Sequence, residues 1–304
     1  MKLQGGKTSD LENLILDTIQ AAGSRLEFHA FFMQKTAGSY FCERMFPQNV
    51  YNRDKGSWAD PHTRWARRFT QFDIYYMGHG TFRDVSLFNR SMPTSHPRAV
   101  EHWHAHRDDE LKSPLRIGSV RNPYSFLYSL WTWGTFLPDP NRLNHTVPPG
   151  QTKPFHRLNY LALHFETFKD FVRTLCSPEI SGVDTKMREL CLDLSQNPYH
   201  WNFSDGHLSP LDIVLRSECM TDIVTCIGQA GGQTIPEFHP EHEVNVINKP
   251  KDYLKEYDDE MIGWVQHRWG WLLEMFGYDL EGPTDSNVFL HVKDLDVSEY
   301  IPTE

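Results

Sequence analysis

The stretch FHAFFMQKTAGSYF, residues 28–41, joins an apolar run to a polar loop, and this junction decides the fold prediction. Its first half is typical of a buried strand, and we predict a strand over residues 26–33. Its second half brings Lys35, Thr36 and Ser39 together where a helix would begin. The first N–H groups of a helix lack intrachain acceptors and carry partial positive charge. The junction therefore predicts either an anion cradle of backbone amides, a lysine and hydroxyls, or a plain polar turn that caps a helix.

Strand and helix patterns alternate along the rest of the chain. Short apolar runs predict strands over residues 73–78, 115–120 and 211–218. Apolar residues at helical spacing predict helices over residues 10–22, 165–175, from Thr221 onward, and over 258–276 with a stop at Gly277. This alternation predicts an α/β fold with a central, mainly parallel sheet flanked by helices.

We expect residues 1–304 to form one domain, with residues 1–25 as an N-terminal helical segment. Residues 138–154 carry five prolines and no periodicity, which predicts a long loop that serves as a substrate flap.

Composition limits the function classes. The net charge of −10 disfavours a nucleic-acid binder, which needs a basic face. No run of about 18 apolar residues predicts a membrane span. The five cysteines have no paired spacing, so a disulfide framework is not expected. A soluble cytoplasmic protein without a membrane or nucleic-acid partner is the expectation, and the oligomeric state stays open.

A second anion site is predicted after the strand over residues 115–120. There the sequence RNPYSFLYS places Arg121 at the strand end and Ser129 eight residues later. Pro123 favours a helix start, which puts Ser129 about two turns into that helix. Arginine offers a planar fork to phosphate, although a strand-end arginine also pairs readily with a carboxylate. Two anion sites at strand ends of one sheet suit a ligand with two separated phosphate groups.

These stretches resemble a known family. QKTAGSYF is similar to the 5′-phosphosulfate loop, P-K-T-[AG]-[GS]-[ST], of sulfotransferases that use 3′-phosphoadenosine 5′-phosphosulfate (PAPS). SVRNPYSFLYSLW resembles their 3′-phosphate motif, and the resemblance to carbohydrate-type members continues through LDIVLRSECMTDIVTCIG and the C-terminal segment. It covers most of residues 26–280. The chain departs from the pattern at Gln34, Tyr40 and Pro250.

The resemblance implies a P-loop-like fold and a role for each matched residue. Lys35 would contact the 5′-phosphate and the bridging oxygen of PAPS, and Arg121 with Ser129 would hold the 3′-phosphate. The 5′-phosphosulfate would be held by the loop that follows the lysine, namely Thr36, Ala37, Gly38, Ser39 and Tyr40. The reaction needs no metal.

The acceptor hydroxyl must lose a proton, and a neutral imidazole suits that task. His79 follows the strand predicted over residues 73–78, at the sheet edge expected for Lys35 and Arg121, and the family often carries a catalytic histidine there. The alternating residues His102, His104 and His106 offer an alternative base, or a zinc site. A solvated polar loop is the plainer interpretation of that run.

Together these features predict a PAPS-dependent sulfotransferase. The sulfuryl group would pass to a hydroxyl or amine of a small-molecule or glycan acceptor, with His79 as base and Lys35 on the leaving group. The alternatives are a P-loop-like kinase, a zinc-dependent hydrolase that uses the histidine run, and a non-catalytic nucleotide-binding protein.

Overall fold

The fold is taken from a computed structural model, which describes about half of the chain in several segments. The described residues are 2–23, 26–31, 41, 44–45, 51–52, 57–58, 66–76, 115–135, 165–179, 211–235 and 253–296. Their strands are β1 (Gly5–Gly6), β2 (Leu26–Phe31), β3 (Tyr51–Asn52), β4 (Ser57–Trp58), β5 (Ala66–Arg68), β6 (Phe72–Tyr76), β7 (Arg116–Val120), β8 (Ile213–Arg216) and β9 (Phe289–His291). Their helices are α1 (Thr8–Ala22), α5 (Pro123–Thr135), α8 (Phe168–Cys176), α10 (Met220–Ala230) and α11 (Asp259–Phe276), with 3₁₀ turns η2 (Ser217–Cys219) and η4 (Tyr253–Glu256).

The chain divides into two compact units. The sheet unit consists of Leu3–Val120, Tyr199–Asn245 and Asp285–Glu304. The helical unit consists of Met1–Lys2, Arg121–Pro198 and Val246–Thr284. The expectation of a single domain stays a prediction.

The sheet unit is built on seven strands in the order β1-β9-β8-β7-β2-β6-β5. The four strands β8, β7, β2 and β6 run parallel, whereas β5, β9 and β1 each pair antiparallel with their neighbours. The main sheet therefore has three parallel and three antiparallel pairings, and the separate β3–β4 ribbon adds a fourth antiparallel one. The mixture of helix and strand is confirmed. The expectation of a mainly parallel sheet is not, because β5 and β9 run against the four central strands.

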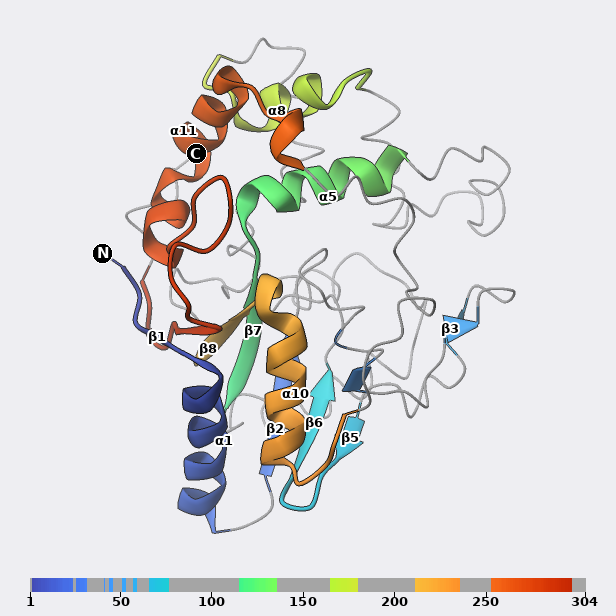
Figure 1. The fold of residues 1–304 in the computed structure, drawn as a ribbon, viewed down its shortest axis with the longest axis vertical. Helices are drawn as coiled ribbons and strands as arrows, with labels where there is room; N and C mark the ends of the chain where they lie inside the picture. The colour runs from blue at the N-terminus through green and yellow to red at the C-terminus, as the bar shows by residue number, and fades with distance from the viewer. Residues whose placement is uncertain are drawn as a thin grey trace, which may run out of the picture. The chain divides into compact units, whose positions relative to one another are not determined.

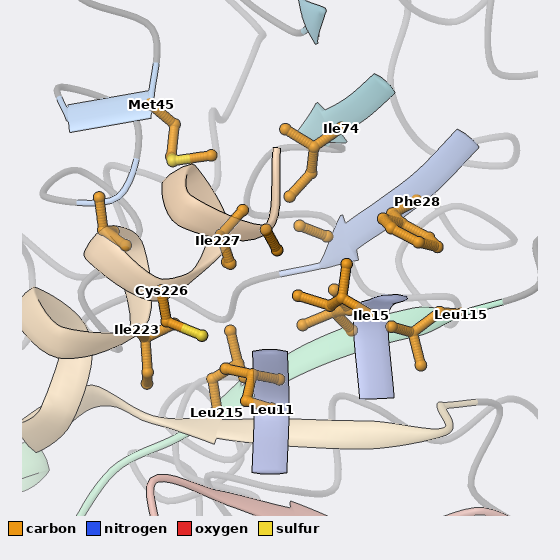
Figure 2. Close-up of a cluster of buried hydrophobic side chains, with 14 of the residues drawn as sticks. Leu11, Ile15, Phe28, Met45, Ile74, Leu115, Leu215, Ile223, Cys226 and Ile227 are labelled. Carbon is orange, nitrogen blue, oxygen red and sulfur yellow. The ribbon is translucent and has the colours of Figure 1, made fainter. Parts of the chain in front are cut away.

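Helices α1 and α10 lie side by side against one face of the sheet (Figure 1). Figure 2 shows how Leu11 and Ile15 of α1 and Ile223 and Ile227 of α10 converge on apolar strand residues. The i, i+4 spacing of each pair puts both side chains on one helical face, which explains why that face is buried. The helix predicted over residues 10–22 is therefore confirmed as the packed helix α1.

The helical unit contains α5, α8 and α11, and many of its buried side chains are aromatic. Phe168 packs edge-on against Tyr128 of α5 and against Tyr257, with ring centroids 5.2 Å apart in both pairs. Aromatic side chains bury large apolar areas, so these contacts join α8 to α5 and to the segment just before α11.

Local capping signals fix both ends of helix α11, as the sequence predicts. Helix α11 begins after Asp258, whose Oδ1 accepts from Met261 N at 2.9 Å, and ends at Gly277 with a φ of 65°. That φ is left-handed and suits glycine. Among the described helices none is long and apolar enough to cross a membrane.

Strand β8 is shorter than the strand predicted over residues 211–218. After Arg216 the chain turns into the 3₁₀ segment Ser217–Cys219. The Ser217 hydroxyl donates to the Val120 carbonyl oxygen at 2.9 Å, which uses the side chain in place of a strand hydrogen bond. The strand prediction is therefore wrong for its first two residues, Leu211 and Asp212, and for its last two, Ser217 and Glu218.

Candidate anion-binding residues between strand β7 and helix α5

The structure describes one of the two predicted anion sites. Arg121 follows Val120, the last residue of β7, and helix α5 begins two residues later at Pro123. The predicted strand end and helix start are confirmed. The other predicted site residues lie outside the described residues: Lys35, Thr36, Ala37, Gly38, Ser39, Tyr40, His79, His102, His104 and His106, together with the loop 138–154.

The strands that precede the predicted motifs are neighbours in the sheet unit. Strand β2 pairs in parallel with β7 on one side and with β6 on the other, with Ala30 opposite both Ile117 and Tyr76. The pair Phe31–Gly118 extends the β2–β7 register toward the strand ends. Because neighbouring parallel strands end at the same edge, β6, β2 and β7 present their carboxyl ends together.

Asn122 is the N-terminal cap of α5. Its Oδ1 accepts from Tyr124 N at 2.9 Å, and its carbonyl oxygen accepts from Phe126 N at 2.9 Å. The Asn122 Nδ2 donates to the Asp279 carbonyl oxygen at 2.7 Å and so joins this cap to the loop after α11. A side chain that accepts a hydrogen bond from a first-turn N–H leaves fewer N–H donors at the helix end for an anion. The guanidinium of Arg121 is therefore the main cationic group at this helix start.

Arg121 is held against the first turn of α5. Its Nε donates to Ser125 Oγ at 2.9 Å, and the same hydroxyl donates to the Asn122 carbonyl oxygen at 3.2 Å. Ser125 is buried, with 8% of its surface exposed, whereas Arg121 is partly exposed. A buried hydroxyl that both accepts and donates has a fixed orientation, which in turn orients the guanidinium.

Ser129 lies one helical turn after Ser125 and is partly exposed. Residues four apart share a helical face, so Ser129 lies on the same face of α5 as Ser125, the residue that binds Arg121 Nε. Among the described residues the Ser129 hydroxyl makes no hydrogen bond. The joint grip of Arg121 and Ser129 on a phosphate stays a prediction.

Two tyrosines secure this first turn but supply no base. The Tyr257 hydroxyl donates to the Tyr124 carbonyl oxygen at 2.9 Å. Burial raises the pKa of Tyr124 to about 12, and burial also raises the pKa of Tyr257 well above its ordinary value. Both phenols stay protonated near neutral pH, so neither can remove a proton from an acceptor.

The described residues hold no group of three or more histidine, cysteine, aspartate or glutamate side chains placed for a metal. Arg121, the predicted contact to a phosphate, lies among the described residues, and its role as an anion ligand stays a prediction.

Sequence reasoning did not single out Asn122 and Ser125, although both stand in the quoted motif. An asparagine directly before a proline-initiated helix is a capping signal, and Arg121 with Ser125 has the i, i+4 spacing of side-chain pairs. These two signals were sufficient to find them.

No protein-family model, no curated protein and no solved structure matches this chain.

Proposed function

We propose that this protein is a sulfotransferase that transfers the sulfuryl group of PAPS to a hydroxyl or amine of a small-molecule or glycan acceptor. One observation carries the proposal: three adjacent parallel strands of the sheet unit each lead into a predicted site residue. Strand β2 ends four residues before Lys35, β6 ends three residues before His79, and β7 ends directly before Arg121. Ligands of α/β sheets bind outside the carboxyl ends of such strands.

The parallel centre of the sheet also supports the P-loop-like fold that the motifs imply. In that fold a loop between a central strand and a helix binds phosphate through backbone amides. Residues 36–40 would form this loop after β2 and hold the 5′-phosphosulfate. The order β6-β2-β7 places β2 between the strand that leads to the proposed base and the strand that leads to Arg121.

The proposed reaction is an in-line displacement at sulfur. The acceptor oxygen or nitrogen forms a bond to sulfur while the bond between sulfur and the bridging oxygen of PAPS breaks. The acceptor proton passes to His79, and the electron pair of the broken bond stays on the 5′-phosphate of the desulfated product, PAP. Lys35 neutralises the charge that grows on the bridging oxygen. The step requires no metal or redox partner.

The acceptor is proposed by class alone. A net charge of −10 favours a neutral or cationic molecule over a polyanion, because a polyanion would be repelled at long range. The cytoplasmic location stays a prediction.

A thermal-shift comparison tests the proposal against its rivals. The wild-type protein is heated with PAP, with adenosine 5′-monophosphate, with ATP and magnesium, and with zinc alone. A ligand that binds only the native state at 100 times its dissociation constant stabilises it by about 2.7 kcal/mol. We expect PAP to give the largest shift and Arg121→Ala to reduce it. A shift with ATP and magnesium but none with PAP would overturn the proposal in favour of a kinase, and a shift with zinc alone would favour a hydrolase.

A further inference from the structure

A surface groove of about 190 Å³ opens in the sheet unit where β7 and β8 begin and β9 ends. Strand β7 is five residues long, so the groove lies roughly 15 Å from the carboxyl end of that strand, which leads to the predicted nucleotide site. The groove is therefore separate from that site. Its lining combines apolar, hydroxyl and charged side chains, among them Leu14, Thr18, Leu115, Asp212, His291 and Lys293.

One wall of the groove is a fixed ion pair. Asp212 Oδ2 accepts from Arg116 N at 2.8 Å and from Arg116 Nε at 3.1 Å, and Asp212 Oδ1 accepts from Arg116 Nη2 at 3.2 Å. Val292 N donates to the Asp212 carbonyl oxygen at 3.0 Å, which holds the end of β9 against the start of β8. Because Arg116 neutralises the Asp212 carboxylate, this wall is preformed and carries little net charge.

Lys293 gives the lining a surplus of positive charge. Its side chain is exposed, and within the described part of the chain its ammonium group makes no ion pair or hydrogen bond. His291 packs its ring edge-on against Phe289, with centroids 5.2 Å apart, and its ring nitrogens make no hydrogen bond to any described residue. The groove is thus locally positive on a chain whose net charge is −10, and an anionic group suits it.

Thr18 adds a hydrogen-bond acceptor to the lining. Its hydroxyl donates to the Leu14 carbonyl oxygen at 2.6 Å, so its proton is used within α1 while its oxygen can still accept. Leu14 and Leu115 contribute apolar surface. A ligand that matches this lining carries an anionic group for Lys293, a hydroxyl donor for Thr18 and a short carbon chain.

We propose that this groove binds a small hydroxycarboxylic acid, with the carboxylate at Lys293 and the hydroxyl donating to Thr18 Oγ1. The size agrees with this class. A volume of 190 Å³ is about six times the share of one water in the liquid, which suits a molecule of about six non-hydrogen atoms. The proposal does not depend on the proposed function, because the groove and the carboxyl ends of the strands are separate.

The closing experiment is a ligand titration of the full chain followed by saturation-transfer NMR, which detects weak binding. The probes are lactate, propionate and inorganic phosphate. Propionate matches lactate except that it lacks the hydroxyl group. We expect lactate to bind the wild type about 2- to 10-fold more tightly than propionate, the usual contribution of one hydrogen bond. This comparison needs no variant, so it stands even where a substitution impairs folding.

Three variants separate the two contacts. Lys293→Ala should weaken lactate binding by about 3- to 10-fold, because the carboxylate loses its cation, whereas Lys293→Arg should retain it. Thr18→Val keeps the shape of the side chain and removes the hydroxyl, so lactate and propionate should bind this variant equally. Lys7→Ala is the matched control, because it removes one exposed positive charge from the same unit and Lys7 does not line the groove.

The site is supported if lactate binding falls in Lys293→Ala but not in Lys7→Ala, and if the preference for lactate over propionate is lost in Thr18→Val. Equal losses in the two lysine-to-alanine variants would show long-range charge attraction and overturn the site. Three other results would overturn the hydroxycarboxylic acid: no lactate binding, equal affinities of the wild type for lactate and propionate, or tighter binding of phosphate. The thermal-shift test with PAP is independent of all these outcomes.

Discussion

Arg216 Nη1 lies 2.6 Å from Asp285 Oδ1, and the arginine side chain has no exposed surface while the aspartate keeps 22%. The two residues are 69 positions apart in the chain. Arg216 also donates to the Asn287 carbonyl oxygen at 3.0 Å. This pair ties the end of β8 to the segment that leads into β9, so that a buried charge joins two parts of the sheet unit.

Removal of the Asp285 carboxylate should therefore lower the free energy of unfolding. Asp285→Ala leaves the Arg216 charge buried without its carboxylate, and we expect the free energy of unfolding to fall by about 3–5 kcal/mol. Urea denaturation followed by circular dichroism measures it. Arg173→Ala is the control, because Arg173 is 57% exposed and lies 3.4 Å from Asp170, an arrangement that contributes about 0–1 kcal/mol. Equal effects of the two variants would contradict the importance of the buried pair.

Asn122→Ala should destabilise the start of α5. The variant loses the cap on Tyr124 N and the bond to the Asp279 carbonyl oxygen, and we expect a loss of about 2–3 kcal/mol in the free energy of unfolding. Asn122→Asp keeps the cap acceptor but loses the Nδ2 donor, so it should fall between wild type and alanine. A change below about 0.5 kcal/mol for alanine would show that neither bond matters.

Protonation of Asp258 should account for part of the stability that the protein loses in acid. Its pKa is lowered by the hydrogen bond from Lys169 and then by that from Met261 N, so the folded state binds its proton less tightly than the unfolded state. The stabilisation is present above the ordinary value of about 3.9 and is lost as the pH falls below it through the folded pKa. Asp258→Asn keeps a capping oxygen but does not titrate, and its stability should fall less between neutral pH and about pH 3. Denaturation curves over this pH range, at low salt, measure the difference. If wild type and Asp258→Asn lose the same stability in acid, Asp258 does not contribute to the loss.

Lys35→Ala should lower kcat by roughly 10²–10³, the usual cost of one preorganised donor at developing charge. The reason is that the lysine acts on the bridging oxygen as the sulfuryl group departs, more than on bound PAPS. Initial rates with saturating PAPS, together with calorimetric binding of PAP, separate the two roles. If only the KM for PAPS changes, Lys35 is a binding residue and its proposed role on the leaving group is wrong.

His79→Ala should lower kcat by roughly 10²–10⁴, as expected for loss of a positioned base. PAP binding should be unchanged, because the imidazole would face the acceptor. In the wild type kcat/KM should rise with pH through a group near 6.5, roughly the ordinary pKa of histidine, and the variant should lose that limb.

Alanine variants at His102, His104 and His106 provide the comparison for this prediction. A normal rate for His79→Ala with a collapse at one of these three would move the base to the histidine run. Retained activity in all four variants would exclude these four histidines as the base.

The sequence alone determined the elements whose signals are local. Pro123 predicts the start of α5, and Asp258 with Gly277 predicts both ends of α11, because caps and fixed dihedral angles act within one turn. Apolar spacing likewise predicts α1, since periodicity shows which side of a helix is buried, and a short apolar run predicts the strand β7. The position of Arg121 between β7 and α5 could be predicted as well, because local signals mark the end of that strand and the start of that helix.

The tertiary structure decided which elements meet. Periodicity does not name a partner, so the antiparallel pairing of Gly5–Gly6 with Phe289–Leu290, from opposite ends of the sequence, had no local signal. Gly5 is needed there because a side chain at that position would collide with the Phe289 carbonyl oxygen. The ion pair of Arg216 with Asp285 depends on the same long-range approach. The orientation of Arg121 by Ser125 required side-chain packing as well as spacing, because an i, i+4 separation permits this hydrogen bond but burial of the serine fixes it.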